Sequence, residues 1–172
     1  LIEIGNCCHN DCYYCGIRRS NSHIERYRLA KEDILACCEE GYNLGFRTFV
    51  MQGGEDNRLT DSRMIDIIST IRKTYPDVAI TLSLGEKDTR TYQQFYEAGA
   101  NRYLLRHETH NEQHYRLLHP SGMSLSNRLR CLNDLKQIGF QTGTGIMVGS
   151  PGQTVDHLIE DILFIESFRP QM

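Results

Sequence analysis

Three cysteines near the start of the chain have the spacing that most clearly predicts chemistry. Cys8, Cys12 and Cys15 follow an apolar run at residues 1–5 in the spacing C-x3-C-x2-C. Iron-sulfur clusters usually have four cysteine ligands, so a loop with three predicts a 4Fe-4S cluster in which one iron is left open. As at a catalytic zinc ion, the open position would admit a further ligand. The spacing therefore predicts a reactive cluster held by these three thiolates.

A structural zinc ion is the alternative for the same loop, with His9 or Cys7 as its fourth ligand. Structural zinc sites usually pair two short ligand couples across a longer gap, and no second couple is visible here, so the cluster is favoured. The total of seven cysteines is odd, which fits a disulfide framework poorly. Tyr14, directly before Cys15, offers an aromatic face that would shield the cluster or pack over a bound cofactor.

The rest of the chain alternates short apolar runs with longer segments of helical period. This pattern is typical of parallel strands joined by crossover helices. Gly45, Gly99 and Gly139 stand where helix C-caps are expected. We expect strands at residues 1–5, 47–52, 78–84, 101–106 and 141–148, and helices at residues 31–44, 61–75, 89–98, 124–138 and 156–165.

Five such units predict an α/β fold, and we favour a partial TIM-type (βα) barrel. A complete eight-stranded barrel needs about 250 residues, whereas the chain has 172. We treat residues 1–172 as a single domain, since no linker or low-complexity tract interrupts it. The chain begins at Leu1 rather than Met and stops where a sixth strand would begin, so we expect the N-terminal part of a barrel without its C-terminal strands.

Polar residues follow the second predicted strand at the end where βα barrels hold their active sites. Gln52 is followed by Gly53, Gly54 and Glu55. Paired glycines allow the backbone to approach a ligand closely and to offer its carbonyl groups to an ammonium group. The alternative is a tight loop that carries a solvated acid.

The third and fourth predicted strands also carry polar side chains. Thr81 and Ser83 alternate with apolar residues, so we expect both to face the interior of the barrel. Arg106 and Glu108 share one face of the fourth strand, and His107 points the other way. Buried charges must compensate each other or be engaged by a ligand, so an internal salt bridge is the alternative to a binding site.

The cysteine loop, with its aromatic residue before the last cysteine, resembles the signature of the radical S-adenosylmethionine (SAM) superfamily. The segments at residues 15–19, 25–28 and 104–109 resemble the iron-iron hydrogenase maturase family HydE, whose relatives include biotin synthase and methylornithine synthase. The resemblance implies that the open iron chelates SAM and cleaves it reductively, which releases a 5'-deoxyadenosyl radical.

The resemblance also implies roles for the polar residues. Arg128 matches an arginine near the SAM carboxylate, although the spacing before it departs by one residue from the family pattern, and an exposed helix arginine is the alternative. The residues expected to bind SAM are Tyr14, Gly53, Gly54, Glu55, Ser83, Glu108 and Arg128. Those expected to line the substrate cavity as catalytic positions are Gln52, Thr81 and Arg106.

The resemblance therefore implies a HydE-like radical SAM enzyme that acts in maturation of the iron-iron hydrogenase active site. The implied substrate is a small molecule of the iron-cysteine organometallic class. The implied partners are a low-potential electron donor such as ferredoxin or flavodoxin, and other hydrogenase maturases. Biotin synthase-like and methylornithine synthase-like enzymes are the alternatives within the superfamily. A non-catalytic zinc-binding module is the alternative outside it.

Composition excludes other classes of function. The hydrophobic content of 40% and charged content of 24% are those of an ordinary globular protein. The formal net charge of -3 gives no basic excess for neutralising phosphates, so we expect no nucleic-acid partner. No apolar stretch approaches the roughly 20 residues needed to span a bilayer, so we expect no membrane association and a cytoplasmic protein.

Overall fold

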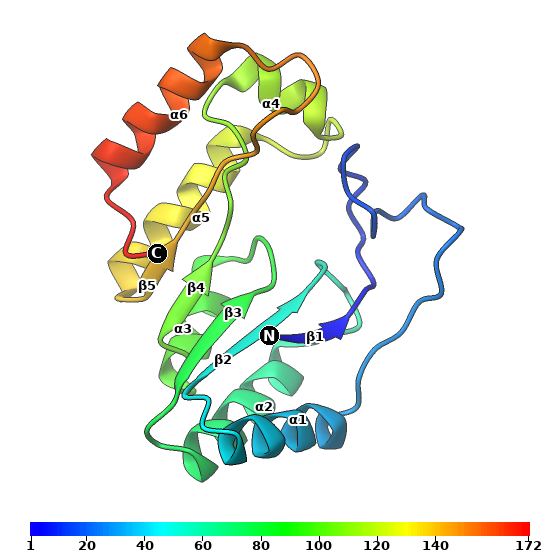
Figure 1. Cartoon of the computed structure of the whole chain (residues 1–172), viewed down its shortest axis with the longest axis vertical. Coiled ribbons are helices and arrows are strands. Elements are labelled where there is room, and N and C mark those ends of the chain that lie inside the picture. The colour runs from blue at the N-terminus through cyan, green and yellow to red at the C-terminus, as the bar shows by residue number, and fades with distance from the viewer.

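Five parallel strands form one sheet in the sequential order β1-β2-β3-β4-β5. The computed structural model describes residues 1–172 (Figure 1). The strands are β1 (Ile2–Gly5), β2 (Thr48–Gly53), β3 (Ala79–Ser83), β4 (Arg102–Leu104) and β5 (Gln141–Gly143). The helices are α1 (Lys31–Asn43), α2 (Asp61–Thr74), α3 (Thr89–Glu97), α4 (Glu112–Leu118), α5 (Leu125–Ile138) and α6 (Val155–Phe168). Sequential parallel pairing is the pattern of consecutive βα units in a barrel, which confirms the five predicted units.

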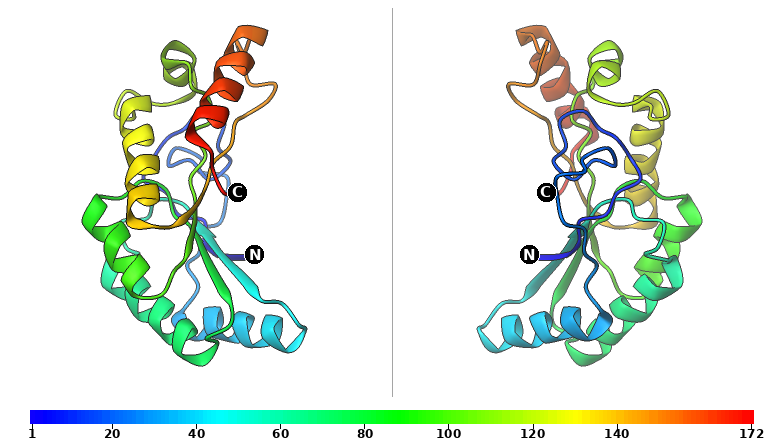
Figure 2. Two further views of the ribbon diagram at one scale, coloured as in Figure 1. Left: turned by 90° about the vertical axis from the view of Figure 1, so that its left-hand side faces the viewer. Right: turned by 90° about the vertical axis from the view of Figure 1, so that its right-hand side faces the viewer.

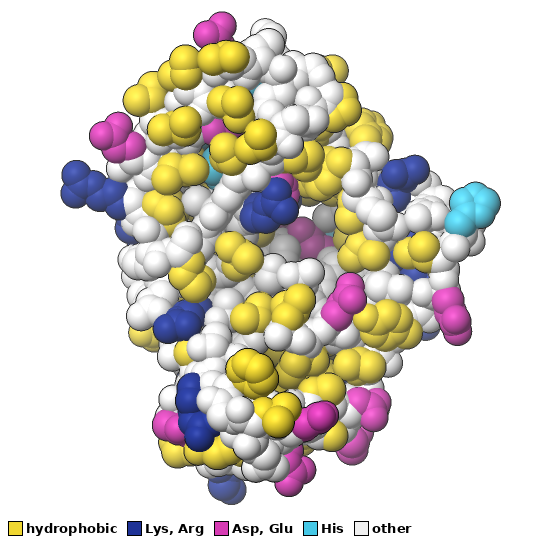
Figure 3. Space-filling view, in the orientation of Figure 1, with side chains coloured by type: hydrophobic (Ala, Val, Ile, Leu, Met, Phe, Trp, Pro, Cys, Tyr) yellow, Lys and Arg dark blue, Asp and Glu magenta, His cyan; other side chains and the backbone are white.

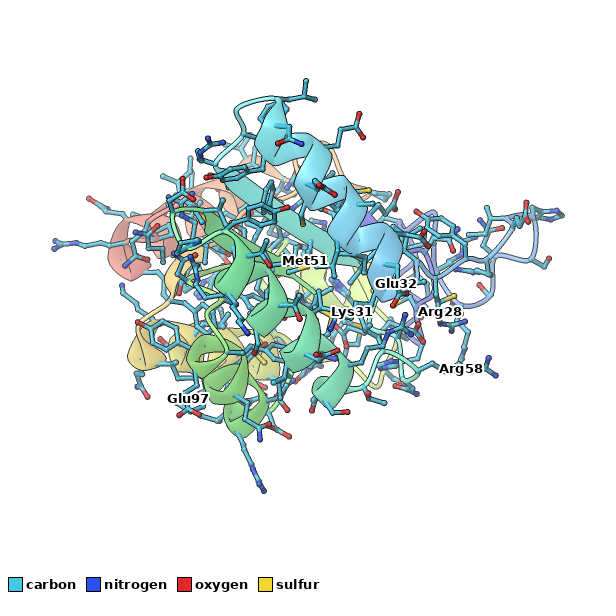
Figure 4. The ribbon with its side chains drawn as sticks, turned by 90° about the horizontal axis from the view of Figure 1, so that it is seen from below. Arg28, Lys31, Glu32, Met51, Arg58 and Glu97 are labelled. Carbon is cyan, nitrogen blue, oxygen red and sulfur yellow. The ribbon has the colours of Figure 1, made fainter.

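One face of the sheet is covered by the helices that connect the strands. Helices α1, α2, α3 and α5 follow one another along this face (Figure 2). Apolar side chains of the strands and helices meet there in a core of 24 buried residues. Met51 of β2 is fully buried in this core, between α1 and α2 (Figure 4). Burial of this apolar layer is what holds the strands in their order.

The opposite face of the sheet carries the predicted polar residues. Gln52 is in register with Ser83, and Thr81 is in register with Val50 on β2 and Arg102 on β4. Residues in register across parallel strands share a face, and successive side chains alternate between faces. Because Met51 lies in the helix-covered core, Gln52, Thr81 and Ser83 lie on the other face, as predicted.

The fourth and fifth strands are shorter than predicted. Strand β4 ends at Leu104, so Arg106 and Glu108 lie beyond it and not within it. Glu108 has a φ of 67°, which no extended strand accommodates. A single parallel bridge joins Glu108 to Ile146, so the two chain segments stay adjacent beyond the regular sheet.

The helices differ from the prediction in two places. Helix α4 was not predicted, because its 7 residues are too few to show a helical period. Helix α6 extends to Phe168, beyond the predicted end at residue 165. The three predicted cap glycines do have positive φ, at 93° for Gly45, 115° for Gly99 and 109° for Gly139. None of the helices combines the length and the apolar character needed to cross a membrane.

Candidate active site

The three cysteines lie in the segment at residues 6–30 that connects β1 to α1. This segment rises from the sheet toward α4 and returns to α1 (Figure 1). At its far point the Tyr13 N–H donates to the Leu118 carbonyl of α4 at 3.0 Å. On its return the Leu29 N–H donates to the Ile4 carbonyl of β1 at 2.9 Å. The cysteine loop is therefore held between the carboxyl end of the sheet and α4.

A single arginine fixes the fold of this loop. The guanidinium of Arg26 donates four hydrogen bonds to backbone carbonyl oxygens within the segment. These acceptors are Asn6 at 2.6 Å, Ile17 at 2.8 Å, Arg18 at 2.7 Å and Asn21 at 3.1 Å. The sequence did not single out Arg26 as a functional residue, because no local pattern shows that one side chain gathers carbonyls from both sides of the loop.

All three predicted ligand thiols are free and half-buried. Burial, together with the neighbouring thiols of Cys15 and Cys8, raises the pKa of Cys12 to about 12, so the three lie within electrostatic range of one another. Cys7 differs, because it is buried and its Sγ donates to the Tyr27 carbonyl at 3.7 Å. No group of three or more His, Cys, Asp or Glu side chains converges on the point where one metal ion could be held. Three thiolates that each bind a different iron of a cluster need not meet at one such point.

Gly54, which follows β2, packs directly against the cysteine loop. A Cβ atom built at Gly54 would overlap the Cys7 carbonyl oxygen and lie 2.6 Å from the Cβ of Cys8. A Cβ atom at Gly53 would lie 3.3 Å from the Gly5 carbonyl oxygen, a much milder contact. The lack of a side chain at position 54 is therefore required by the protein itself, before any ligand is considered.

Glu55 connects the cysteine loop to the loop that follows β3. Its carbonyl accepts from the His9 N–H at 2.9 Å, and its carboxylate accepts from the Glu86 N–H at 2.9 Å. The side chain packs over Gly85, which has a φ of 75° and whose missing Cβ leaves the room. Glu55 is thus placed beside the predicted cluster ligands.

Two ion pairs line the same end of the sheet, and of their four side chains only that of Arg106 is exposed. Arg128 Nε lies 2.8 Å from Glu86 Oε1, and Arg106 Nη2 lies 3.0 Å from Glu108 Oε2. The second pair is the internal salt bridge given as the alternative for these residues. Burial raises the pKa of Glu86 and of Glu108, and the charge of Arg128 offsets part of each shift.

Several buried polar atoms around these pairs have no hydrogen bond. Three of these atoms belong to the two ion pairs, which are close in distance but lack hydrogen-bond alignment. The atoms are Glu86 Oε1, Arg128 Nε, Glu108 Oε2 and the hydroxyl of Tyr115. Buried polar groups are hydrogen-bonded in the great majority of native structures, and an exception needs a reason. Charged groups of both signs at one end of the sheet fit a zwitterionic ligand such as an amino acid moiety.

Figure 3 shows a hollow in this face of the molecule, between the cysteine-loop segment and the part that holds α4 and α6. Acidic side chains are visible inside the hollow. Gln52 and Ser83 stand side by side near the ends of β2 and β3, and buried Thr81 lies two residues earlier. Arg106 is more exposed, and its guanidinium also donates to the Ile146 carbonyl at 3.0 Å. The structure thus gathers the predicted residues at one end of the sheet, with Thr81 farthest from that end.

Three residues of the site were not predicted. Glu86 is the third residue after the end of β3, so the rule that active sites lie at carboxyl ends of strands could have found it. Tyr115 and His119 belong to α4 and its C-cap, which had no sequence signal. The hydroxyl of Tyr14 lies 3.1 Å from Nε2 of His119, and this contact fixes the aromatic ring beside the cysteines.

The fold and the site together are those of a radical SAM protein. The profile of the Radical SAM superfamily matches residues 2–165, and the chain belongs to this superfamily. Its cofactors are a 4Fe-4S cluster and SAM, and the donor set described above fits both: three free thiols in one loop, and unsatisfied charged groups beside them.

Individual members of the superfamily share sequence or fold with this chain. The chain is 46% identical over 166 residues to the [FeFe] hydrogenase maturase subunit HydE of Thermotoga maritima, which covers 96% of this chain and 47% of that protein. It is 28% identical to 3-methylornithine synthase of Methanosarcina acetivorans, over 100% of this chain and 49% of that protein. A crystal structure of methylornithine synthase superposes with a TM-score of 0.91 at 27% identity, over 98% of this chain and 50% of that one. The chain spans about half the length of these relatives.

Proposed function

We propose that the protein is a radical SAM enzyme that reductively cleaves SAM at a 4Fe-4S cluster held by Cys8, Cys12 and Cys15. The observation that carries the proposal is the set of charged groups gathered beside the three free thiols of the cysteine loop, on Glu86, Glu108 and Arg128. When bound and reduced, the cluster supplies the electron that breaks a carbon-sulfur bond of SAM. The residues of the chain bind and orient the cofactor for that step.

The charges of the site residues indicate which of them would bind the carboxylate of SAM and which would bind its ammonium group. Arg128 is buried and cationic, so it would bind the carboxylate. Glu108 and the backbone carbonyls of Gly53 and Gly54 would bind the ammonium group. Glu55 would hold these glycines against the cysteine loop, and Tyr14 would shield the cluster from water. Ser83, on the inner face, would complete the polar lining.

We further propose a HydE-like role in maturation of the iron-iron hydrogenase active site. The identity of 46% to the HydE subunit supports this role over the methylornithine synthase reading, at 28%, and over the biotin synthase reading, at 26%. Gln52, Thr81 and Arg106 would contact a small-molecule substrate of the iron-cysteine organometallic class. Ferredoxin or flavodoxin would deliver the electron, and other hydrogenase maturases would be the partners.

Anaerobic reconstitution with iron and sulfide, followed by dithionite reduction with SAM, tests the proposal. We expect a brown, oxygen-labile cluster and formation of 5'-deoxyadenosine, measured by chromatography. A colourless protein that retains zinc and forms no product would contradict the assignment. Addition of an iron-cysteine carbonyl-cyanide complex should then stimulate SAM cleavage. Unchanged cleavage would reject the HydE-like role and leave the radical SAM activity intact.

A further inference from the structure

Asp161 of α6 is a fully buried carboxylate outside the candidate site. It is 0% exposed and accepts a hydrogen bond from the His110 N–H. Its ion-pair contact is with the equally buried His107, whose Nε2 lies 3.9 Å from Oδ1. Asp161 Oδ2 and His107 Nε2 both lack a hydrogen bond. A buried carboxylate without a close cation is costly, so the protonation of this pair needs an explanation.

The hydrogen bonds of His107 show which of its two ring nitrogens carries a proton and which one faces Asp161. Nδ1 lies 2.9 Å from the hydroxyl of Thr144, and that hydroxyl donates to the Leu105 carbonyl at 3.0 Å. The Thr144 oxygen is then the acceptor, so Nδ1 carries a proton. Nε2 faces the carboxylate either with a lone pair or with a second proton. At 3.9 Å the contact is too long for a hydrogen bond, and one titratable proton on either group makes the pair neutral overall.

The charged surroundings agree with a pair that holds one titratable proton and has no net charge. Burial lowers the pKa of His107 to about 4 and raises the pKa of Asp161, so a lone charge on either group is disfavoured. Arg106 and Arg128 act on His107 from the side of the candidate site, and His110 acts on both members of the pair. His114 also faces Asp161, and no lysine or arginine forms an ion pair with it.

This pair holds the backbone next to Glu108. His107 packs on Phe164 of α6, with ring centroids 4.7 Å apart, while the adjacent Glu108 turns its carboxylate to Arg106. Glu108 has a φ of 67°, in the left-handed region that costs a non-glycine residue roughly 1–2 kcal/mol. Such a conformation persists only where the surrounding structure enforces it.

We propose that His107 and Asp161 form a buried pair of no net charge that ties α6 to the turn carrying Glu108 and thereby positions the Glu108 carboxylate for SAM. His107 and Asp161 are positioning residues, since neither reaches the hollow itself. The inference rests on the proposed role of Glu108 in SAM binding. The affinity for SAM would then depend on the contact between Asp161 of α6 and His107 in the turn before Glu108.

Titration of the reconstituted protein with SAM, before any reductant is added, tests this inference. Asp161→Ala should weaken SAM binding about tenfold or more, equivalent to roughly 1.4 kcal/mol, at unchanged iron and sulfide content. Asp161→Asn should retain most of the affinity, because its amide oxygen can still accept from the His110 N–H and no charge is buried. Thr144→Val keeps the shape of the residue but frees Nδ1, and should weaken binding in the same direction.

Glu160→Gln is the matched control, since Glu160 lies next to Asp161 on α6 but bonds to Asn111 Nδ2 at 3.0 Å instead. It should bind SAM as the unmodified protein does. Thermal unfolding checks that each variant folds. If Asp161→Ala does not fold, Thr144→Val provides the test. Unchanged affinity in both variants, equal losses in Glu160→Gln, or no rescue by Asp161→Asn would overturn the inference. Failure of the unmodified protein to bind SAM would instead reject the proposed function.

Discussion

The Cβ atom that position 54 lacks would lie 2.6 Å from the Cβ of Cys8. Gly54 and Cys8 therefore belong to two loops packed with no space between them. One loop follows β2, and the other holds the predicted cluster ligands. Because the Cys7 carbonyl backbone also borders Gly54, the conflict could not be relieved by rotation of a flexible side chain.

Gly54→Ala is expected to prevent assembly of the cluster. The added methyl group would push the cysteine loop away from β2 and displace Cys8. Iron and sulfide content after anaerobic reconstitution is the measurement, and we expect it to fall to a small fraction of the normal value. Gly16→Ala is the control, because a Cβ atom there would meet nothing within 4 Å. Normal cluster content in Gly54→Ala would show that the two loops can separate without harm.

Arg26→Ala is expected to loosen the cysteine loop. Four carbonyl oxygens would lose a charged donor, and each such hydrogen bond contributes about 1.5–3 kcal/mol when buried, less where water replaces it. We expect the free energy of unfolding to fall by roughly 2 kcal/mol, measured by denaturant titration. Protease cleavage within residues 6–30 should become faster. Arg19→Ala is the control, since Arg19 is exposed and lies in the same loop; equal effects of both variants would refute the role of Arg26.

Cys12→Ala should abolish the cluster, whereas Cys7→Ala should leave it intact. Cys12 is half-buried near Cys8 and Cys15, while the thiol of Cys7 donates to the Tyr27 carbonyl. Absorbance of the reconstituted protein in the visible range separates the two variants. Loss of the cluster in Cys7→Ala would mean that Cys7, and not its neighbour Cys8, is the first ligand of the motif.

Glu108→Gln should weaken SAM binding about tenfold while the cluster assembles normally, because an amide interacts less strongly with an ammonium group than a carboxylate does. Titration calorimetry under anaerobic conditions measures the affinity. Glu112→Gln serves as the comparison, since Glu112 is on the exposed side of α4 in an ion pair with Arg116. Equal affinities in the two variants would remove Glu108 from the SAM site.

The stability of the protein should fall as the pH drops from 6.5 toward 4. Burial lowers the pKa of His119 from 6.5 to about 4, so the unfolded chain binds a proton there more tightly than the folded one. The stabilisation is complete above pH 6.5 and is lost at up to about 1.4 kcal/mol per pH unit below it. Denaturant titrations of the metal-free protein should show a weaker pH dependence in His119→Gln than in His23→Gln. The same slope in both would exclude His119 as the cause.

Local patterns in the sequence were sufficient for the cysteine loop and the order of the elements. The spacing of Cys8, Cys12 and Cys15 predicts shared ligation because the residues are close along the chain. The alternation of apolar runs predicts five βα units because each run must be buried on the same sheet. The placement of Glu55 and Glu108 at strand ends follows from the same order.

Only the tertiary structure decided which distant residues meet. Arg128 reaches Glu86 because α5 packs beside α3, and Asp161 reaches His107 because α6 packs behind the turn after β4. Each of these contacts joins residues from different βα units. Their distances depend on how helices pack on the sheet, which no local period encodes. The sequence was therefore sufficient to predict the three cysteine ligands, whereas the polar surroundings that would orient SAM were determined by packing.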